Sequence, residues 1–127
     1  MPYLNRLSLI GRLTADPKAS QLPDNTPVSA FRLICHEIRM NPRKDEFHFF
    51  KIRVFGKTAS LCNQYLYKGC TVYVEGRVIP KRYRRKKEDG TLDETYWQHT
   101  FEIYSHQVQM LARPGQDGKP KMNEQTQ

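Results

Sequence analysis

Aromatic rings and cations alternate in the segment FHFFKIRVF, residues 47–55. Because successive side chains of a strand point to opposite faces, this segment as a strand separates an apolar face from a mixed one. Rings stack on unpaired bases of any sequence, and cations between them bind phosphates. The mixed face therefore predicts a surface for single-stranded nucleic acid, although such rings also mark protein interfaces. The apolar face carries Phe50, Ile52 and Val54, and the mixed face carries Phe47, Phe49, Lys51, Arg53 and Phe55.

A second group of cations lies in residues 77–87, where seven of eleven residues are Lys or Arg and Tyr83 stands among them. A run of charge alone is typical of a solvated loop. A run that contains a ring and continues from an aromatic, basic strand instead favours an arm of the same groove. The acidic residues that follow at 88–94 are expected at the tip of this arm, away from the nucleic acid.

The whole chain is basic. Its 127 residues include 21 Lys and Arg against 13 Asp and Glu, which gives a net charge of +8 and an isoelectric point near 9.6. This balance favours a polyanionic partner, nucleic acid first and an anionic membrane second. No run of the sequence approaches the roughly 18 apolar residues of a membrane span, and the N-terminus has no signal-peptide pattern. We therefore expect a protein without a membrane partner.

The sequence carries no pattern typical of catalysis, metal binding or a cofactor site. Cys35, Cys62 and Cys70 are odd in number and irregularly spaced, which is typical of reduced, mostly buried thiols in a reducing compartment. The GKT tripeptide at 56–58 lacks the glycine that a phosphate-binding loop has five positions before it, since Lys51 stands there. We expect a protein that is not an enzyme, with no catalytic residue, no metal site and no cofactor.

The hydrophobic periodicity predicts the elements that position these residues. Alternation predicts five strands, and a spacing of three and four residues predicts one helix with Thr58 and Gly69 as its cap residues. Residues 39–46 are expected to form a polar hairpin loop, and Pro80 to end regular pairing or to mark an edge. The strands cover residues 6–13, 28–38, 47–55, 70–79 and 96–111, and the helix covers residues 58–69.

The order of three strands, one helix and two strands is that of an OB-fold. We therefore predict an all-β protein with one helix, in which a five-stranded Greek-key barrel has the helix between strands 3 and 4. The OB domain is expected to span residues 1–112. Residues 113–127 contain Pro, Gly and Gln but no apolar face, which predicts a disordered tail.

Several segments together resemble one family. They are LNRLSLIGRLTADP, VSAF, FFKIRVFGK, YLYKGCTVYVEGRV and VQML, and they extend from Leu4 to Leu111. In these segments the chain is similar to the bacterial and mitochondrial single-stranded-DNA-binding proteins. The resemblance implies an OB-fold homotetramer that coats single-stranded DNA in replication, repair and recombination and needs no cofactor. It also implies a location in the bacterial cytoplasm, at the nucleoid, rather than in the mitochondrial matrix, with replication or recombination proteins as further partners.

The resemblance also assigns site residues by position. Phe49 and Phe55 match stacking aromatics of the family, and Tyr83 matches another. Arg39 stands where the family often has an aromatic, and a guanidinium can also stack on a base. With the matching polar and basic positions and the neighbouring cations, the predicted DNA-binding residues are Asn5, Arg6, Arg39, Phe49, Lys51, Arg53, Phe55, Lys57, Lys68, Arg77, Lys81, Arg82, Tyr83, Arg84 and Arg85.

The chain ends in KMNEQTQ, without the acidic tip that recruits partner enzymes in bacterial members of the family. We therefore expect a form without this tip, from a mobile element, a phage, a competence system or a mitochondrion, or else a truncated sequence. Three other functions stay open. They are a primosomal replication-restart protein that acts mainly as a protein–protein adaptor, an oligomerisation or adaptor module whose rings bind protein, and an RNA-binding OB domain, because stacking does not detect the 2′-hydroxyl.

Overall fold

The structure, a computed structural model, describes residues 3–86 and 88–115. Alternating apolar residues form its barrel strands, and the spacing of Ala59 and Cys62 gives its helix one buried face. In chain order the elements are β1 (Leu7–Leu13), β2 (Lys18–Gln21), β3 (Pro27–Arg39), β4 (Lys44–Phe55), α1 (Lys57–Tyr65), β5 (Thr71–Lys86) and β6 (Leu92–Ala112).

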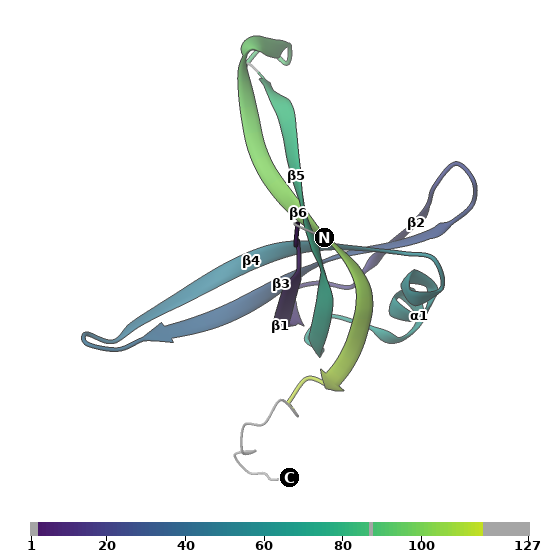
Figure 1. Ribbon diagram of the computed structural model, residues 1–127, viewed down its shortest axis with the longest axis vertical. Helices are drawn as coiled ribbons and strands as arrows, with labels where there is room; N and C mark the ends of the chain where they lie inside the picture. The colour runs from purple at the N-terminus through teal and green to yellow at the C-terminus, as the bar shows by residue number, and fades with distance from the viewer. Residues whose placement is uncertain (1–2, 87, 116–127) are drawn as a thin grey trace.

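The strands β1, β3, β4, β5 and β6 close into a barrel (Figure 1). β5 pairs antiparallel with β1 and β6, β6 runs parallel to β4, and β4 pairs antiparallel with β3. The pairs Arg12–Ile34 and Leu13–Leu33 join β1 to β3 and complete the closure. Because α1 follows the third barrel strand and precedes the fourth, the predicted OB-fold is confirmed.

The apolar faces of the strands fill the barrel interior. Ile52 and Val54 of β4 are fully buried together with Leu33 and Ile103, and Phe50 is half-buried against them. Each fully buried side chain of this size contributes about 1.5–3 kcal/mol to folding. The face of β4 that was predicted to be apolar therefore points into the barrel, and this fixes the mixed face of the same strand on the outside.

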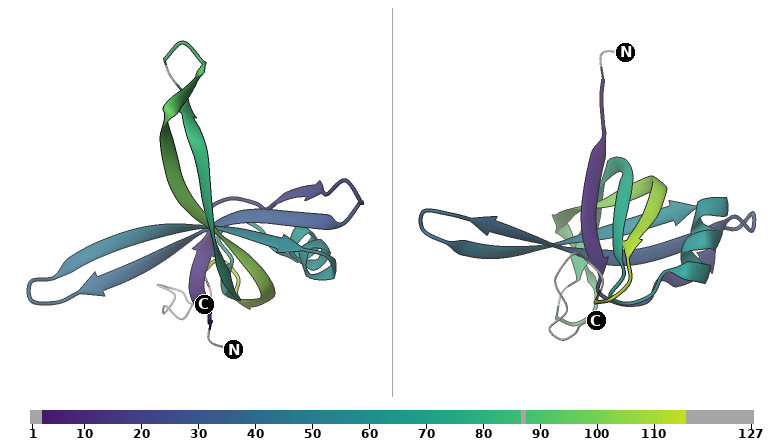
Figure 2. Two further views of the ribbon diagram at one scale, coloured as in Figure 1. Left: turned by 45° about the horizontal axis from the view of Figure 1, so that its top comes forward. Right: turned by 90° about the horizontal axis from the view of Figure 1, so that it is seen from below.

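The β2–β3, β3–β4 and β5–β6 hairpins extend from the barrel in different directions (Figures 1 and 2). The β3–β4 ladder continues to the pair Arg39–Lys44, and the β5–β6 ladder continues to the pair Lys86–Leu92. Strand β2 was not predicted from the sequence. Its four residues, KASQ, are all exposed, so no alternation of apolar and polar residues marks them as a strand.

The prediction of a polar loop over 39–46 is wrong, because the turn occupies only residues 40–43 and the strands continue on both sides of it. The charged residues of this segment face one another across the two strands. Arg39 Nε lies 2.8 Å from Glu46 Oε1 on the opposite strand and 3.8 Å from Glu37 Oε1 on its own strand. An exposed two-stranded ribbon can thus be stabilised by cross-strand ion pairs instead of an apolar face.

Pro80 does not end the pairing of its strand. It lies opposite Phe101 in the β5–β6 ladder, which continues to Lys86, so most of the basic run at 77–87 belongs to a paired hairpin around the turn at Asp89 and Gly90. The structure agrees with the other expectation, that Pro80 marks an edge of the sheet. The ladder between β1 and β5 ends at the pair Leu7–Gly76, and beyond it β5 pairs with β6 alone among the described strands. The missing N–H of proline is tolerated at such an edge.

The ends of the helix differ from the prediction. α1 begins at Lys57 after Gly56, which has φ 77° and provides no side-chain cap, so Thr58 is not the cap residue. The helix ends at Tyr65, and Gly69 lies in the following loop, where its N–H donates to the Leu13 carbonyl at 2.9 Å. No helix in the described part of the chain is long and apolar enough to cross a membrane. The tail predicted over 113–127 lies mostly outside the described residues, and its disorder stays a prediction.

Candidate nucleic-acid interface

An open groove of about 860 Å³ lies between β4 and the near part of the β5–β6 hairpin. It forms where the parallel pairing of β4 with β6 places Arg53 beside Tyr104 and Ile52 beside Ile103. The pairing buries the isoleucines and turns their neighbours outward. The groove is lined by Arg32, Phe49, Lys51, Arg53, Lys81, Arg82, Tyr83, Thr100, Phe101, Glu102 and Tyr104.

Exposed aromatic rings surround this groove. Phe49 is 57% exposed, Tyr83 is 49% exposed and Phe101 is 46% exposed. The structure thus brings together two rings that the sequence predicted in separate segments, Phe49 and Tyr83. It adds Phe101, whose ring also lies 6.4 Å from that of the half-buried Phe50. Rings that keep free faces next to a basic groove are suited to stacking on planar, unpaired bases.

Phe55 was predicted to stack on DNA, but it does not line the groove. Its ring is half-buried and meets the ring of Tyr104 edge-on, with the centroids 5.1 Å apart. Tyr104 itself does line the groove. Sequence reasoning missed Phe101 and Tyr104, although both stand in the aromatic segment 96–111 that was predicted as a strand. Their orientation follows from the register of β4 with β6, which the sequence does not reveal.

Lys51 and Arg53 lie in the groove as predicted, but both contact an acidic residue there. Lys51 Nζ is 3.4 Å from Glu102 Oε2, and Arg53 Nε is 2.9 Å from Glu102 Oε1. The Glu102 side chain is only 11% exposed, and among the described residues that line the groove it is the one carboxylate. No signal in the sequence separated Glu102 from the other acidic residues of the chain.

The cations of β5 lie against rings of β6. Lys81 Nζ donates a 2.9 Å hydrogen bond to the Tyr104 hydroxyl and lies 5.3 Å from the centre of that ring. The Arg77 guanidinium lies 5.7 Å from the same ring centre, outside the lining of the groove. Contacts of this kind hold a cation in place while leaving its donors available to an anion.

The tryptophan of the hairpin, Trp97, lies between two arginines. The guanidinium groups of Arg82 and Arg84 are each 4.5 Å from the centre of its ring. Arg82 also lines the groove, so this cluster continues the basic surface from the groove along the hairpin. The prediction for Arg85 concerns a side chain outside the described part of the structure, although its backbone belongs to β5.

Asn5 and Arg6 were predicted as DNA-binding residues, but they lie outside the groove and bind β5. The Asn5 side-chain amide donates to the Val78 carbonyl at 2.8 Å and accepts from the Val78 N–H at 2.9 Å. Arg6 Nη2 lies 2.8 Å from Glu75 Oε2. This hydrogen bond and the adjacent charge raise the pKa of Arg6, and the same hydrogen bond lowers the pKa of Glu75. These contacts attach the residues just before β1 to strand β5.

Lys57 and Lys68 also lie outside the groove lining. Lys57 is the exposed first residue of α1. Lys68 is exposed in the loop before β5, where its backbone N–H donates to Asp16 Oδ1 at 2.8 Å. The structure therefore divides the predicted site into residues that meet in one groove and residues that are distributed over the surface of the barrel.

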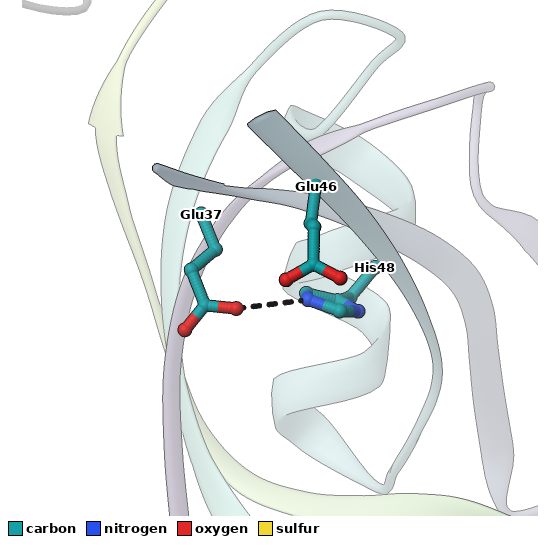
Figure 3. A group of neighbouring side chains, drawn as sticks. All are labelled: Glu37, Glu46 and His48. Atoms are coloured by element: carbon teal, nitrogen blue, oxygen red, sulfur yellow. Dashed lines mark hydrogen bonds and ion pairs between the residues drawn. The ribbon is translucent and has the colours of Figure 1, made fainter. Parts of the chain in front are cut away.

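Arg39 belongs to a charged cluster on the β3–β4 hairpin, remote in sequence from the groove residues of β5 and β6. Figure 3 shows the other members, Glu37, Glu46 and His48, whose possible ligand atoms lie within 4.8 Å of one another. His48 Nε2 is 3.2 Å from Glu37 Oε1. The Arg39 guanidinium is already paired with Glu46 at 2.8 Å, so a cation of the protein neutralises this group of acids.

Comparison with known proteins gives one consistent result. The sequence model of the Single-strand binding protein family matches residues 4–111. A protein named Single-stranded DNA-binding protein from Aquifex aeolicus is 36% identical over 114 residues, which is 87% of this chain and 72% of that protein. One of the same name from Neisseria meningitidis serogroup A is 32% identical over 112 residues, which is 86% of this chain and 60% of that protein.

A solved structure shares the fold. The structure titled "Plasmodium falciparum SSB complex with ssDNA" superposes with a TM-score of 0.74 at 24% sequence identity, covering 88% of this chain and 98% of that chain. The barrel and its helix are therefore an arrangement already observed in a solved protein.

Proposed function

Because the chain belongs to the single-strand binding protein family, we propose that it binds single-stranded DNA with little regard to sequence and protects it during replication, recombination or repair. The observation that carries this proposal is the groove on the outer face of the barrel. There the rings of Phe49, Tyr83 and Phe101 meet five cations that come from three different strands. This is the combination of stacking surfaces and positive charge that an unpaired strand requires.

The rings account for the preference for single strands. A base in a duplex is covered on both faces by its neighbours, whereas a base in a flexible single strand can turn one face to Phe49 or Tyr83. Each such stacking contact is worth about 1–3 kcal/mol and does not depend on which base is stacked. The exposed position of these two rings, at the edge of the groove, leaves their faces accessible.

The cations account for attraction to the sugar–phosphate chain. Arg32, Lys81 and Arg82 line the groove from strands β3 and β5, and Lys81 and Arg82 lie against rings of β6. The net charge of +8 adds a longer-ranged attraction that raises the rate of encounter with a polyanion. Both contributions weaken as salt is added, because binding releases the counterions of the phosphates.

We propose further that the protein acts as a binding protein without catalysis, metal or cofactor, in the bacterial cytoplasm where single-stranded DNA is exposed. We place the DNA-binding domain at residues 1–112 and a disordered tail after it. Replication or recombination proteins are proposed as additional partners on the basis of the family.

We also propose that the protein is a homotetramer. Large apolar side chains outside the groove support self-association, because Ile10, Ile38 and Met40 are all exposed in the single chain. Surfaces of this kind are commonly covered when copies of a chain associate. Light scattering of the purified protein measures the number of subunits, and a monomer at all concentrations contradicts this part of the proposal.

The experiment that tests DNA binding is a fluorescence anisotropy titration of labelled oligo-dT, repeated with a duplex and an RNA of equal length. We expect tight binding to oligo-dT and much weaker binding to the duplex. Equal affinity for the duplex contradicts the stacking mechanism. Preference for the RNA would instead support an RNA-binding OB domain. No binding to any of the three would favour the adaptor functions, in which the rings bind protein.

A further inference from the structure

A carboxylate lines the basic groove beside two of its cations. Glu102 stands on β6 two residues before Tyr104, and its side chain points to the outer face, between the cations of β4. Oε2 lies 3.4 Å from Lys51 Nζ and Oε1 lies 2.9 Å from Arg53 Nε, and the second contact is an ion pair without a hydrogen bond, since neither Oε1 nor Nε has a hydrogen-bond partner in the described structure. An acid at this position repels phosphate and therefore weakens the attraction of the groove for the sugar–phosphate chain.

Because the Glu102 side chain is largely buried, its negative charge acts strongly on neighbouring charges. The side chain is 11% exposed, whereas Lys51 and Arg53 are 51% and 37% exposed. Charges at such partly buried positions are weakly screened by water and salt. A phosphate that approached Lys51 or Arg53 would therefore meet the negative charge of Glu102 at close range. One of these two positive charges is therefore already compensated by a group that cannot dissociate from the protein.

The other cations of the groove are in a different situation. Lys81 contacts the ring and the hydroxyl of Tyr104, and Arg82 contacts the ring of Trp97. Among the described residues, neither these two cations nor the exposed Arg32 forms an ion pair with a carboxylate. Their charge is available to a phosphate without the displacement of an acidic partner.

We propose that Glu102 determines the specificity of the groove by acting as an internal counter-anion that keeps phosphates away from Lys51 and Arg53. Bases then lie over the centre of the groove, beside Phe49, and the phosphates lie toward Arg32, Lys81 and Arg82. This inference rests on the proposed binding of single-stranded DNA. Its consequence is discrimination against duplex DNA, which presents phosphates on its outside and cannot place bases over the carboxylate.

The test is the variant Glu102→Gln, which removes the charge and keeps the shape of the side chain. Affinity for oligo-dT and for a duplex is measured over a series of salt concentrations. Freeing one cation is expected to steepen the slope of log affinity against log salt by about 0.7 and to tighten oligo-dT binding about fivefold at about 0.1 M salt. Duplex binding should become tighter by at least the same factor.

The matched control is Asp24→Asn. It changes the net charge by the same amount in the turn between β2 and β3, and it keeps the oxygen that accepts the Thr26 N–H at 3.0 Å. Its salt slope should equal that of the unmodified chain. An unchanged slope in Glu102→Gln, or weaker binding of oligo-dT, overturns the inference, because Glu102 would then position the cations for phosphate.

A second comparison does not disturb the buried carboxylate and decides the question if Glu102→Gln fails to fold. Arg32→Gln should flatten the salt slope by about 0.7, and Lys51→Gln should flatten it by less than half as much. Equal effects of the two variants overturn the inference. The proposed function fails separately, and visibly, if the unmodified chain does not bind oligo-dT at all.

Discussion

The ring of Phe55 supports the ring of Tyr104 from the side, with the two centroids 5.1 Å apart and the planes at 69°. Tyr104 lines the groove and Phe55 does not. Of the two phenylalanines predicted to stack on DNA, Phe49 therefore lines the groove, whereas Phe55 packs against a residue that lines it.

Phe49→Leu should weaken oligo-dT binding by about 1–3 kcal/mol, because a leucine cannot stack on a base. Phe55→Leu should have a smaller effect on affinity, since leucine still fills the space beside Tyr104. Anisotropy titrations of both variants under one salt condition measure the difference. A larger loss in Phe55→Leu would show that Phe55 leaves Tyr104 to stack on DNA itself.

The salt dependence of binding is set by the charges in the groove. Five cations line it, and three of them, Arg32, Lys81 and Arg82, form no ion pair among the described residues. If about three phosphates are neutralised per subunit, log affinity for oligo-dT should fall with log salt at a slope of about −2. Titrations at several salt concentrations give this slope, and a response near zero excludes phosphate binding as a main source of affinity.

Trp97 offers an internal signal for binding, because it is the single tryptophan of the chain and the guanidinium groups of Arg82 and Arg84 each lie 4.5 Å from the centre of its ring. A phosphate that binds Arg82 should alter the contact of the guanidinium with the indole. Tryptophan emission should therefore change during a titration with oligo-dT and reach its plateau with the anisotropy. In Arg82→Gln the emission change should be smaller. A constant emission during saturating binding would place the DNA away from this hairpin.

The ion pair of Arg6 and Glu75 predicts a pH effect on stability. The hydrogen bond from Arg6 lowers the pKa of Glu75 below its ordinary value of 4.5. A carboxylate with a lowered pKa stabilises the folded state above that ordinary value, and the contribution is lost as pH falls through the pKa of the folded state. Glu75→Gln should therefore lower the melting temperature near neutral pH, and this difference should diminish at acidic pH, as the carboxylate of the unmodified chain becomes protonated.

Thermal unfolding of the unmodified chain and of Glu75→Gln at both pH values tests this. Arg6→Gln is the companion variant, because it removes the other partner of the same pair and should show the same convergence at acidic pH. A difference in melting temperature that stays constant down to acidic pH would mean that Glu75 acts through packing and not through its charge.

Much of the fold followed from one property of the sequence, the alternation of apolar residues. In β4 it separated Ile52 and Val54 from Phe49 and thereby predicted both the core face and the face of the groove. It could not find β2, which is exposed on both faces, nor the outer half of the β3–β4 hairpin, where ion pairs replace apolar contacts. Periodicity detects burial, and these segments bury little.

The site could be predicted only in part, for a related reason. Phe49, Lys51 and Tyr83 were found because rings and cations stand close together in the sequence. Glu102 was missed because its position in the groove depends on the parallel register that sets β6 beside β4, which joins residues far apart in the chain. Asn5 was assigned to the site by position in the family, and its actual partner, the backbone of Val78, is visible only in the folded barrel.

The outer part of β5, from Arg77 to Lys86, has a further consequence for the behaviour of the protein at high concentration. Beyond Gly76 one side of this strand has no neighbouring strand among the described residues. Apart from Val78, whose N–H and carbonyl bind the Asn5 side chain, its backbone groups can pair with the same strand of another molecule. The proline and the lysine and arginine side chains along it oppose that association by mutual repulsion and by interrupting the row of donors. The basic hairpin therefore also protects the protein from edge-to-edge aggregation while no polyanion covers it.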